Sequence, residues 1–349
     1  PDVGFEIFDA MLERGGHLWL GADFGRFHLR VRRDPFQRLL HSAEIPAGFG
    51  ARVRGMVATA DRLHVNTEAE GYWLMDAKDG RVLLADTSDD LRYAMHGDRN
   101  NGVWSAEGDL LEHRTANGER LPDGLRLPGQ LPWSLLPMPE NVMLMGTYHG
   151  LLWVDRTTGL ATSMSTGASE DLDKAVVMHL ARDRSGKLLA CTSEGLFVLN
   201  ENATVKERWW SGAMGADSAF HLPCTDVRHF HEHADGALWL ATADAGLVHW
   251  DRSSGRTRSI TRRDGLPSNS VYAVYADDEG QLWLPTDNGI ARYDPRSGQV
   301  HTFSVLDGIT HNEFNRLAHA QGPDGRLYFG GLNGITVIDP KQSRPPQAG

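Results

Sequence analysis

Three histidines alternate along one short segment of the chain, at His229, His231 and His233. In an extended strand every second side chain lies on the same face, so the three imidazoles would share a face. Neutral imidazole is a ligand for zinc, copper and nickel, which makes a metal site one interpretation. The interpretation that we favour is that two of these histidines pack inside the fold and that His233 belongs to a turn. We therefore predict no metal site, and the sequence gives no sign of a cofactor.

Amide and carboxylate side chains form a second cluster in the segment THNEFN, where Glu313 has Asn312 and Asn315 close by. Such groups hydrogen-bond sugar hydroxyls, so the cluster is a candidate ligand site. The alternative is that these side chains bind backbone groups of a tight loop. Asn269 and His221 occupy corresponding places in upstream segments and are candidates for the same reason.

Aromatic side chains supply further binding candidates. Trp209 and Trp210 are adjacent, and an exposed indole can stack on the apolar face of a sugar ring. Such a pair can also simply cover the edge of a sheet. A long insertion follows this pair, and long loops often form a binding rim. Tyr148 and His149 lie in a short turn, which we place on the rim opposite Glu313.

The sequence contains no catalytic motif of recognisable spacing. An enzyme would need a nucleophile with a base, or paired carboxylates in a cleft. No nucleophile elbow, phosphate loop or zinc-protease helix occurs in the 349 residues. We predict a binding protein that is not an enzyme. The alternatives are a polysaccharide lyase or hydrolase that uses Glu313, His221 or His149, and a module that binds only other proteins.

A repeated unit must hold these residues in place, because eight similar segments follow one another along the chain. Each combines a strand candidate, a polar turn, a second strand that often carries Leu-Trp, a glycine turn and a third strand. The second strands begin near Gly16, Arg62, Gly102, Asn141, Gly186, Gly236, Gly280 and Gly325. The mean spacing of about 44 residues is typical of β-propeller blades, which bury both faces of each sheet by stacking in a ring.

The predicted fold is an all-β propeller whose blades are four-stranded antiparallel sheets. We expect eight blades, and seven would result if the first and last units shared one sheet. The ring would form a single domain over residues 1–340. The tryptophans at 19, 104, 239 and 283 are expected to fill the gaps between blades, and the turn glycines to take positive φ.

The stretch from Asp264 to Phe303 closely resembles the two-component regulator propeller repeat. The stretch from Asp307 to Pro340 resembles the last repeat of that family, and its NEFN segment is the more specific part. The resemblance implies a periplasmic, ligand-binding region of a membrane-spanning bacterial receptor with a kinase or cyclase output. It also implies a small-molecule or oligosaccharide ligand. Residues 341–349 would begin the link to a β-sandwich that precedes the membrane-anchored signalling domains, and a homodimer is conceivable.

Composition narrows the classes of partner. The net charge of −11 argues against nucleic acid, because phosphate binding needs clustered Lys and Arg. Two cysteines, Cys191 and Cys224, exclude a disulfide-dense scaffold but leave open whether they pair. No apolar run approaches the roughly 20 residues that cross a bilayer. Because the chain starts at Pro1 without a signal peptide, we expect it to be part of a longer protein.

Overall fold

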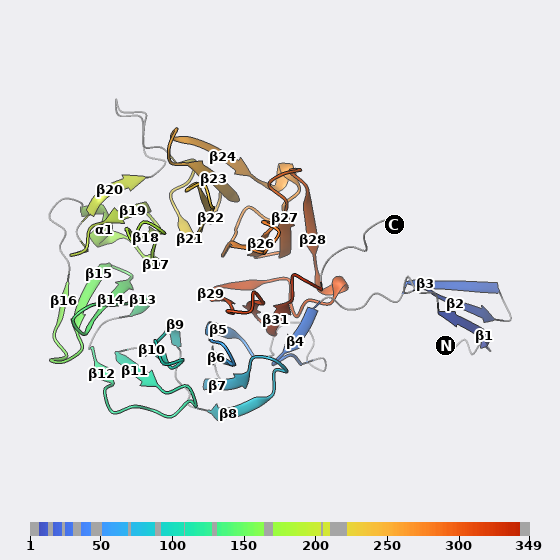
Figure 1. The fold of residues 1–349 in the computed structure, drawn as a ribbon, viewed down its shortest axis with the longest axis horizontal. Coiled ribbons are helices and arrows are strands. Elements are labelled where there is room, and N and C mark those ends of the chain that lie inside the picture. The colour runs from blue at the N-terminus through green and yellow to red at the C-terminus, as the bar shows by residue number, and fades with distance from the viewer. Residues whose placement is uncertain are drawn as a thin grey trace.

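The computed structural model describes residues 7–12, 17–22, 25–30, 36–42, 51–68, 71–87, 92–107, 109–127, 131–163, 170–203, 205–209 and 222–342. These residues form eight antiparallel sheets, of which seven have four strands and one has three. Figure 1 shows the seven four-stranded sheets arranged as blades around a central axis, with the three-stranded sheet outside the ring. The predicted all-β propeller of four-stranded antiparallel blades is confirmed.

Each blade of the ring starts with its inner strand, next to the axis, and ends with its outer strand (Figure 1). The first three blades contain β5 Val53–Ala58, β6 Arg62–Thr67, β7 Gly71–Asp76 and β8 Val82–Asp86; β9 Arg92–Gly97, β10 Val103–Glu107, β11 Leu110–Arg114 and β12 Leu125–Arg126; and β13 Pro132–Met138, β14 Val142–Thr147, β15 Gly150–Asp155 and β16 Ala161–Ser163.

The next three blades follow the same order. They contain β17 Val177–Arg182, β18 Leu188–Thr192, β19 Gly195–Leu199 and β20 Val205–Trp209; β21 Val227–Glu232, β22 Leu238–Thr242, β23 Leu247–Asp251 and β24 Arg256–Ile260; and β25 Tyr275–Ala276, β26 Leu282–Thr286, β27 Gly289–Tyr293 and β28 Val300–Phe303.

The seventh blade joins the two ends of the described chain. Its inner three strands are β29 Phe314–Gln321, β30 Leu327–Gly331 and β31 Gly334–Ile338, and its outer strand is β4 Phe36–Leu39. Strand β4 pairs antiparallel with β31, from Phe36 opposite Ile338 to Leu39 opposite Ile335. Apolar residues of the seventh blade, including Ala318 and Tyr328, pack in one core cluster with Val53 and Leu63 of the first blade. This packing closes the ring.

The first repeat unit forms the three-stranded sheet, with β1 Ile7–Leu12, β2 His17–Ala22 and β3 Gly25–Arg30. Its strands pair in the same order as the inner three strands of a blade. The eight repeat units therefore correspond to eight sheets, and the ring holds seven of them because β4 pairs with β31 rather than with β3. The ring itself thus has seven blades, as in the alternative in which the first and last units share a sheet. The other three strands of the first unit form the eighth sheet.

Residues that recur from unit to unit build the blades as expected. Trp104, Trp239 and Trp283 are buried, and the Trp283 indole N–H donates to Asp277 Oδ2 at 3.0 Å. The turn after the second strand requires glycine. At Gly246 φ is 73°, and a Cβ there would lie 2.1 Å from the Ile260 carbonyl oxygen.

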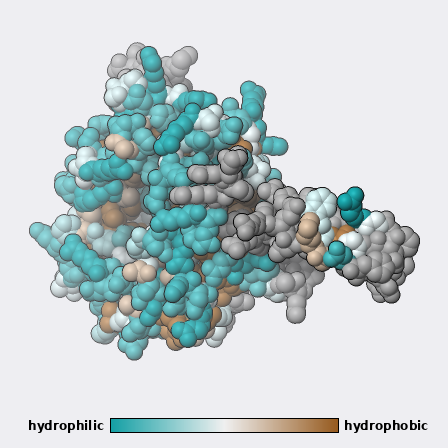
Figure 2. Space-filling model, turned by 45° about the vertical axis from the view of Figure 1, so that its right-hand side comes forward, coloured by the Kyte–Doolittle hydropathy of each residue, from teal (hydrophilic) through white to brown (hydrophobic). Residues whose placement is uncertain are grey.

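Helix is scarce, as predicted. In the described ranges the helical elements are α1 Glu170–Lys174 and two 3-10 turns, η1 Arg262–Asp264 and η2 Val305–Asp307. Over the same ranges no helix has the length and apolar character needed to span a bilayer. Figure 2 shows a mainly hydrophilic surface over the ring, with hydrophobic residues confined largely to its recesses. Cys191 and Cys224 are both buried and are not joined in a disulfide.

Candidate functional site

One end of the ring carries both the turns after the second strands and the connections between blades. In four blades the turn glycine donates its N–H to a carbonyl of the following connection, over 2.5–3.0 Å: Gly150 to Ala175, Gly246 to Asn269, Gly289 to Asn312 and Gly334 to Ala51. We call this end the mouth face. Tyr148 and His149 lie in such a turn and therefore share the mouth face with Asn312. The expectation that they lie on the opposite rim is wrong, because antiparallel order returns these turns to the end where the chain enters each blade.

The inner strands are irregular near the mouth face. In six of them the pairing register shifts directly after the first pair, for example between Val227 and His229 in β21. Such a bulge adds one residue, or more in β29, and re-aims a side chain. The seven residues that directly follow the first paired residue, which we call the bulge residues, are Arg54, Tyr93, Trp133, Met178, Arg228, Tyr272 and Asn315.

Bulge residues of neighbouring blades touch one another around the axis. Arg54 Nη1 donates to Asn315 Oδ1 at 3.1 Å, and the Tyr93 and Trp133 rings stack with centroids 5.5 Å apart. The Arg228 guanidinium lies 4.9 Å from the centroid of the Tyr272 ring. These contacts show that the bulge residues form a ring of side chains around the channel mouth.

A cavity of about 450 Å³ lies inside this ring and has lining residues on all seven inner strands. Its lining includes the bulge residues Tyr93, Trp133, Met178 and Arg228. A volume of several hundred Å³ with a mixture of apolar and polar groups is typical of small-molecule sites. The axial channel is therefore the best candidate for a ligand site.

Aromatic rings occupy one side of the mouth. Trp133 stacks on Tyr93 with an angle of 5° between the ring planes, and Tyr148 meets Trp133 edge-on at 4.9 Å. Tyr148 is exposed. Aromatic faces arranged in this way can stack against the flat or apolar face of a ligand ring.

Charged groups occupy the side formed by β21 and the strands near it. Arg228 is buried, and its Nη1 donates to Ser270 Oγ at 2.8 Å. Asp226 lies close by, with 3.7 Å between its Oδ1 and Arg228 Nε. Burial raises the pKa of Asp226, and the nearby Arg228 and Arg316 only partly oppose this.

Histidines line the channel below the mouth. The ring of His229 lies 4.5 Å from that of His179 and 4.9 Å from that of His319, and His319 Nδ1 is 2.7 Å from Tyr275 Oη. Burial lowers the pKa of His179 to about 4 and that of His319 to about 3, and it lowers the pKa of His229 well below its usual value. All three imidazoles are therefore neutral at physiological pH.

The structure does not arrange these histidines as a metal centre. Across the described part of the chain, no group of three or more His, Cys, Asp or Glu could hold a metal ion. His229 is packed among other rings, whereas His233 lies in a turn and pairs with Asp235 at 3.0 Å. The packed position of His229 and the turn position of His233 agree with the interpretation that we favoured from the sequence, and the lack of a bound metal stays a prediction.

The residues of the predicted polar cluster have different roles in the structure. Asn315 is one of the bulge residues, and its Nδ2 also donates to the Val53 carbonyl at 2.6 Å. Asn269 Oδ1 accepts from the Arg262 N–H, and Asn312 Oδ1 accepts from the Val305 N–H, both at 2.9 Å. These two amides hold η1 and η2, a structural role that the sequence left as an alternative. Their role in ligand binding stays a prediction.

The remaining candidates have different positions. Glu313 and His149 are exposed on the mouth face. His221 and Trp210 lie outside the described residues. Trp209 is only 8% exposed and packs on Trp250 with ring centroids 4.2 Å apart. The exposed platform expected at Trp209 is therefore absent, because the ring fills the gap between two blades.

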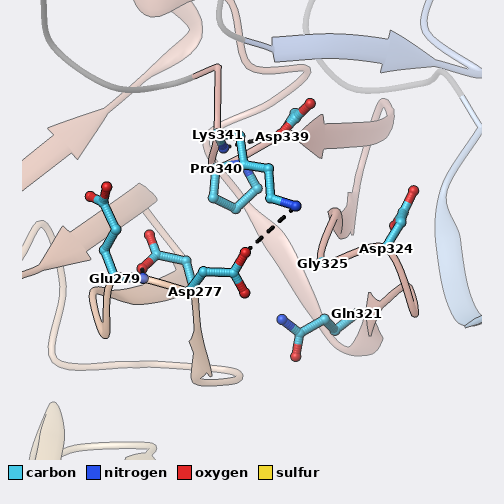
Figure 3. Close-up of a pocket in the computed structure, with 9 residues that line it drawn as sticks. Asp277, Glu279, Gln321, Asp324, Gly325, Asp339, Pro340 and Lys341 are labelled. Carbon is cyan, nitrogen blue, oxygen red and sulfur yellow. Dashed lines mark hydrogen bonds and ion pairs between the residues drawn. The ribbon is translucent and has the colours of Figure 1, made fainter.

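A second hollow, at the other end of the ring, is acidic but small (Figure 3). It holds about 20 Å³, room for about one water molecule. Its carboxylates serve the local structure: Asp277 Oδ1 accepts from the Glu279 N–H at 3.0 Å, and Asp278 pairs with Lys341 at 3.6 Å. We assign no ligand to this hollow.

Sequence reasoning missed most of the mouth, namely Tyr93, Trp133, Arg228 and Arg316. A signal for several of these residues was present. The inner strands of four blades open with Val followed by the bulge residue, at 53–54, 177–178, 227–228 and 271–272. Alignment of the repeats at this Val would have shown one position whose residue changes from blade to blade.

Comparison with known proteins agrees with this architecture. Residues 265–288 match the family model described as two component regulator propeller. This stretch of the chain is therefore similar to a repeat of that family. A stretch of 81 residues is 28% identical to Histidine kinase P4 of Formosa agariphila, covering 23% of this chain and 6% of that protein. The chain thus spans only a small part of the length of this curated relative.

Two solved structures share the fold. The extracellular domain of BT3049 from B. thetaiotaomicron, assigned to a hybrid two component system, matches with a TM-score of 0.75 and 16% identity over 96% of this chain and 45% of that one. Virginiamycin B lyase from Staphylococcus aureus matches with a TM-score of 0.63 and 12% identity, over 87% of this chain and 98% of that one. At these identities the likeness establishes the propeller fold alone.

Proposed function

We propose that this protein is the extracytoplasmic ligand-binding sensor module of a bacterial signalling receptor, with its site at the channel mouth. The observation that carries the proposal is the ring of bulge residues above a cavity of about 450 Å³ to which all seven blades contribute. The match of residues 265–288 to the two component regulator propeller model and the extracellular domain that shares the fold support the sensor role. The periplasm is the compartment that fits a receptor of this class.

The ligand that this mouth suits is a small molecule or an oligosaccharide. The aromatic side, with Tyr93, Trp133 and Tyr148, offers ring faces, and the opposite side offers guanidinium, carboxylate and amide groups. Sugars present both an apolar ring face and hydroxyls, so one saccharide unit could use both sides. Binding would bias the packing of the propeller against a following β-sandwich or a second copy of the chain.

A thermal-shift screen with an oligosaccharide and metabolite library tests the proposal. A ligand that binds the mouth should raise the melting temperature, and Trp133→Ala should reduce its affinity by about tenfold or more. Leu160→Ala is the matched control, because Leu160 is 66% exposed and lies in the turn between β15 and β16, at the other end of the ring. A ligand bound equally well by both variants would place the site elsewhere.

The absence of catalysis is part of the same proposal. The lyase that shares the propeller fold shows that such a ring can carry an active site. In the described residues, however, no hydrogen bond joins the Glu313 carboxylate to a histidine; the Glu313 N–H donates to His311 Nδ1 at 2.9 Å. Incubation of the protein with pools of polysaccharides should release no new reducing ends and no unsaturated products. Turnover lost in Glu313→Gln would favour the lyase or hydrolase alternative.

A further inference from the structure

Arginines of this protein are commonly held by carboxylates in direct hydrogen bonds. Examples are Arg54 with Glu68, Arg114 with Glu112 and Asp86, Arg182 with Glu201, Arg208 with Asp171, and Arg252 with Asp183 and Glu232. Two arginines at the channel mouth, Arg228 and Arg316, have no such bond. This difference is what a ligand site requires, because a guanidinium already occupied by a carboxylate has fewer donors to offer.

Arg228 is buried without a full set of partners. Its side chain is 8% exposed, and the hydrogen bond of its guanidinium within the described chain is the one from Nη1 to Ser270. Its buried Nε has no hydrogen-bond partner, and neither does the buried Oδ1 of Asp226, which lies 3.7 Å away. An unsatisfied buried donor costs about 1–3 kcal/mol, so a group that accepts this hydrogen bond would be favoured.

Arg316 lies at the same mouth and has fewer polar contacts than Arg228. It is exposed, and its side chain has no hydrogen bond or ion pair with any residue that the structure describes. Its guanidinium lies over the Trp133 ring in a cation–π contact, 5.7 Å from the ring centroid, which places it at the aromatic side of the mouth. Burial lowers the pKa of Arg228, the charge of Asp226 opposes this, and the charge of Arg316 lowers that pKa further. Two guanidinium groups that interact electrostatically, with only Asp226 at 3.7 Å from Arg228 as an ion-pair partner among the described residues, favour an anion between them.

We propose that Arg228 and Arg316 form a subsite for an anionic group, a carboxylate or a sulfate, on the ligand that occupies the mouth. This inference rests on the proposed function, and it names the chemical class of the ligand. Because Arg316 lies over Trp133, the anionic group should be attached to the part of the ligand that contacts the aromatic side of the mouth. An acidic sugar unit has this form.

Carboxylates near the subsite act against an anion and set its selectivity. Asp226 is the nearest to Arg228, and Asp287 and Glu313 also act electrostatically on the β25 side of the mouth. Asp226 competes for Arg228 without forming a hydrogen bond to it. Removing its charge should therefore strengthen anion binding, whereas loss of a merely structural ion pair would leave binding unchanged.

Calorimetric titration of the full chain with matched ligands tests the subsite. The probes are cellobiose, lactose and mannobiose, each as the neutral sugar, as the uronic acid and as the sulfate ester, with inorganic sulfate as a separate probe. At least one acidic form should bind about tenfold more tightly than its neutral counterpart, a difference of about 1.4 kcal/mol. Uronic acids and sulfate esters distinguish the two sources of charge.

Substitutions test whether Arg228 and Arg316 cause the preference for an acidic over a neutral ligand. Arg316→Gln should reduce affinity for the acidic form about tenfold and change affinity for the neutral form less than twofold. Asp226→Asn should raise affinity for the acidic form several-fold. Arg228→Lys keeps a charge at the buried position and should weaken binding without unfolding the protein. Arg263→Gln is the matched control, because it removes one exposed positive charge from η1 on the same face.

The outcomes separate this inference from the proposed function. If no acidic form binds better than its neutral counterpart, or if Arg316→Gln affects both equally, the anionic subsite is wrong. A neutral ligand whose affinity depends on Trp133 would then still support the mouth as a ligand site. Failure of Asp226→Asn to strengthen binding of a tight acidic ligand would place its anion away from Arg228.

Discussion

The two ends of the propeller use the same repeat in different ways. At the end away from the mouth, one residue type does the same job in several blades: Asp155, Asp251, Asp294 and Asp339 each accept a backbone N–H two residues further on, at 2.8–3.0 Å. At the mouth, the bulge position holds Arg, Tyr, Trp, Met, Arg, Tyr and Asn in successive blades. Positions that keep their residue type serve the fold, and the position that varies is available for a ligand.

The largest expected difference between the two ends is in how the free energy of unfolding depends on pH. Burial lowers the pKa values of His179, His229 and His319 in the channel, so below pH 6.5 the unfolded chain binds protons that the folded chain does not. The free energy of unfolding should therefore be constant above pH 6.5 and fall as the pH drops towards 4. At pH 5 the loss is about 2 kcal/mol for each of His179 and His319.

The turn carboxylates at the other end titrate in a lower range. Hydrogen bonds lower the pKa of Asp294 below 3.8, so the stabilisation from such groups is complete above pH 3.8 and is lost only in stronger acid. Urea unfolding measured from pH 8 to pH 3 checks this order. His179→Gln should reduce the pH dependence between 6.5 and 4, and an unchanged slope in that variant would contradict the assignment to the channel.

Asp277→Ala should have the next largest effect. It should lower the free energy of unfolding and leave ligand binding unchanged. Asp277 accepts from the Glu279 and Gln281 N–H groups at 3.0 Å and from the Trp283 indole N–H at 3.0 Å. Loss of these bonds leaves the buried indole N–H unpaired and should lower the free energy of unfolding by about 2–3 kcal/mol. Ligand affinity at the mouth should not change. Weakened binding in the folded variant would show that the two ends are coupled.

Asn312→Ala should have the smallest effect on stability. It tests whether the ligand site extends to the connections between blades. The variant loses the hydrogen bond to the Val305 N–H and should lower the free energy of unfolding by about 1 kcal/mol. If Asn312 serves only η2, ligand affinity stays within twofold of the wild type. A tenfold loss of affinity, measured beside Asn269→Ala as the equivalent variant one blade earlier, would extend the ligand site to the connections.

The sequence predicted the repeated blade well because its signals are local. Turn glycines, Asp-led turns and tryptophans on the second strand each act within one unit or between adjacent units, as at Gly246 and Trp283. Part of the candidate site was also within reach, since Asn315 and Tyr148 lie at the mouth. The position of Tyr148 was misjudged because the sequence shows a turn without showing which end of the ring it faces.

By itself the sequence determined that the chain consists of small antiparallel sheets with apolar faces that only a ring can bury. Tertiary structure alone decided how the ring closes, because β4 pairs with β31, from the far end of the ring, rather than with its neighbour β3. It also decided which side chains meet over the channel. Arg228, Arg316 and Trp133 come from three different blades, and their approach depends on strand register and bulges, which the order of residues along one strand does not show.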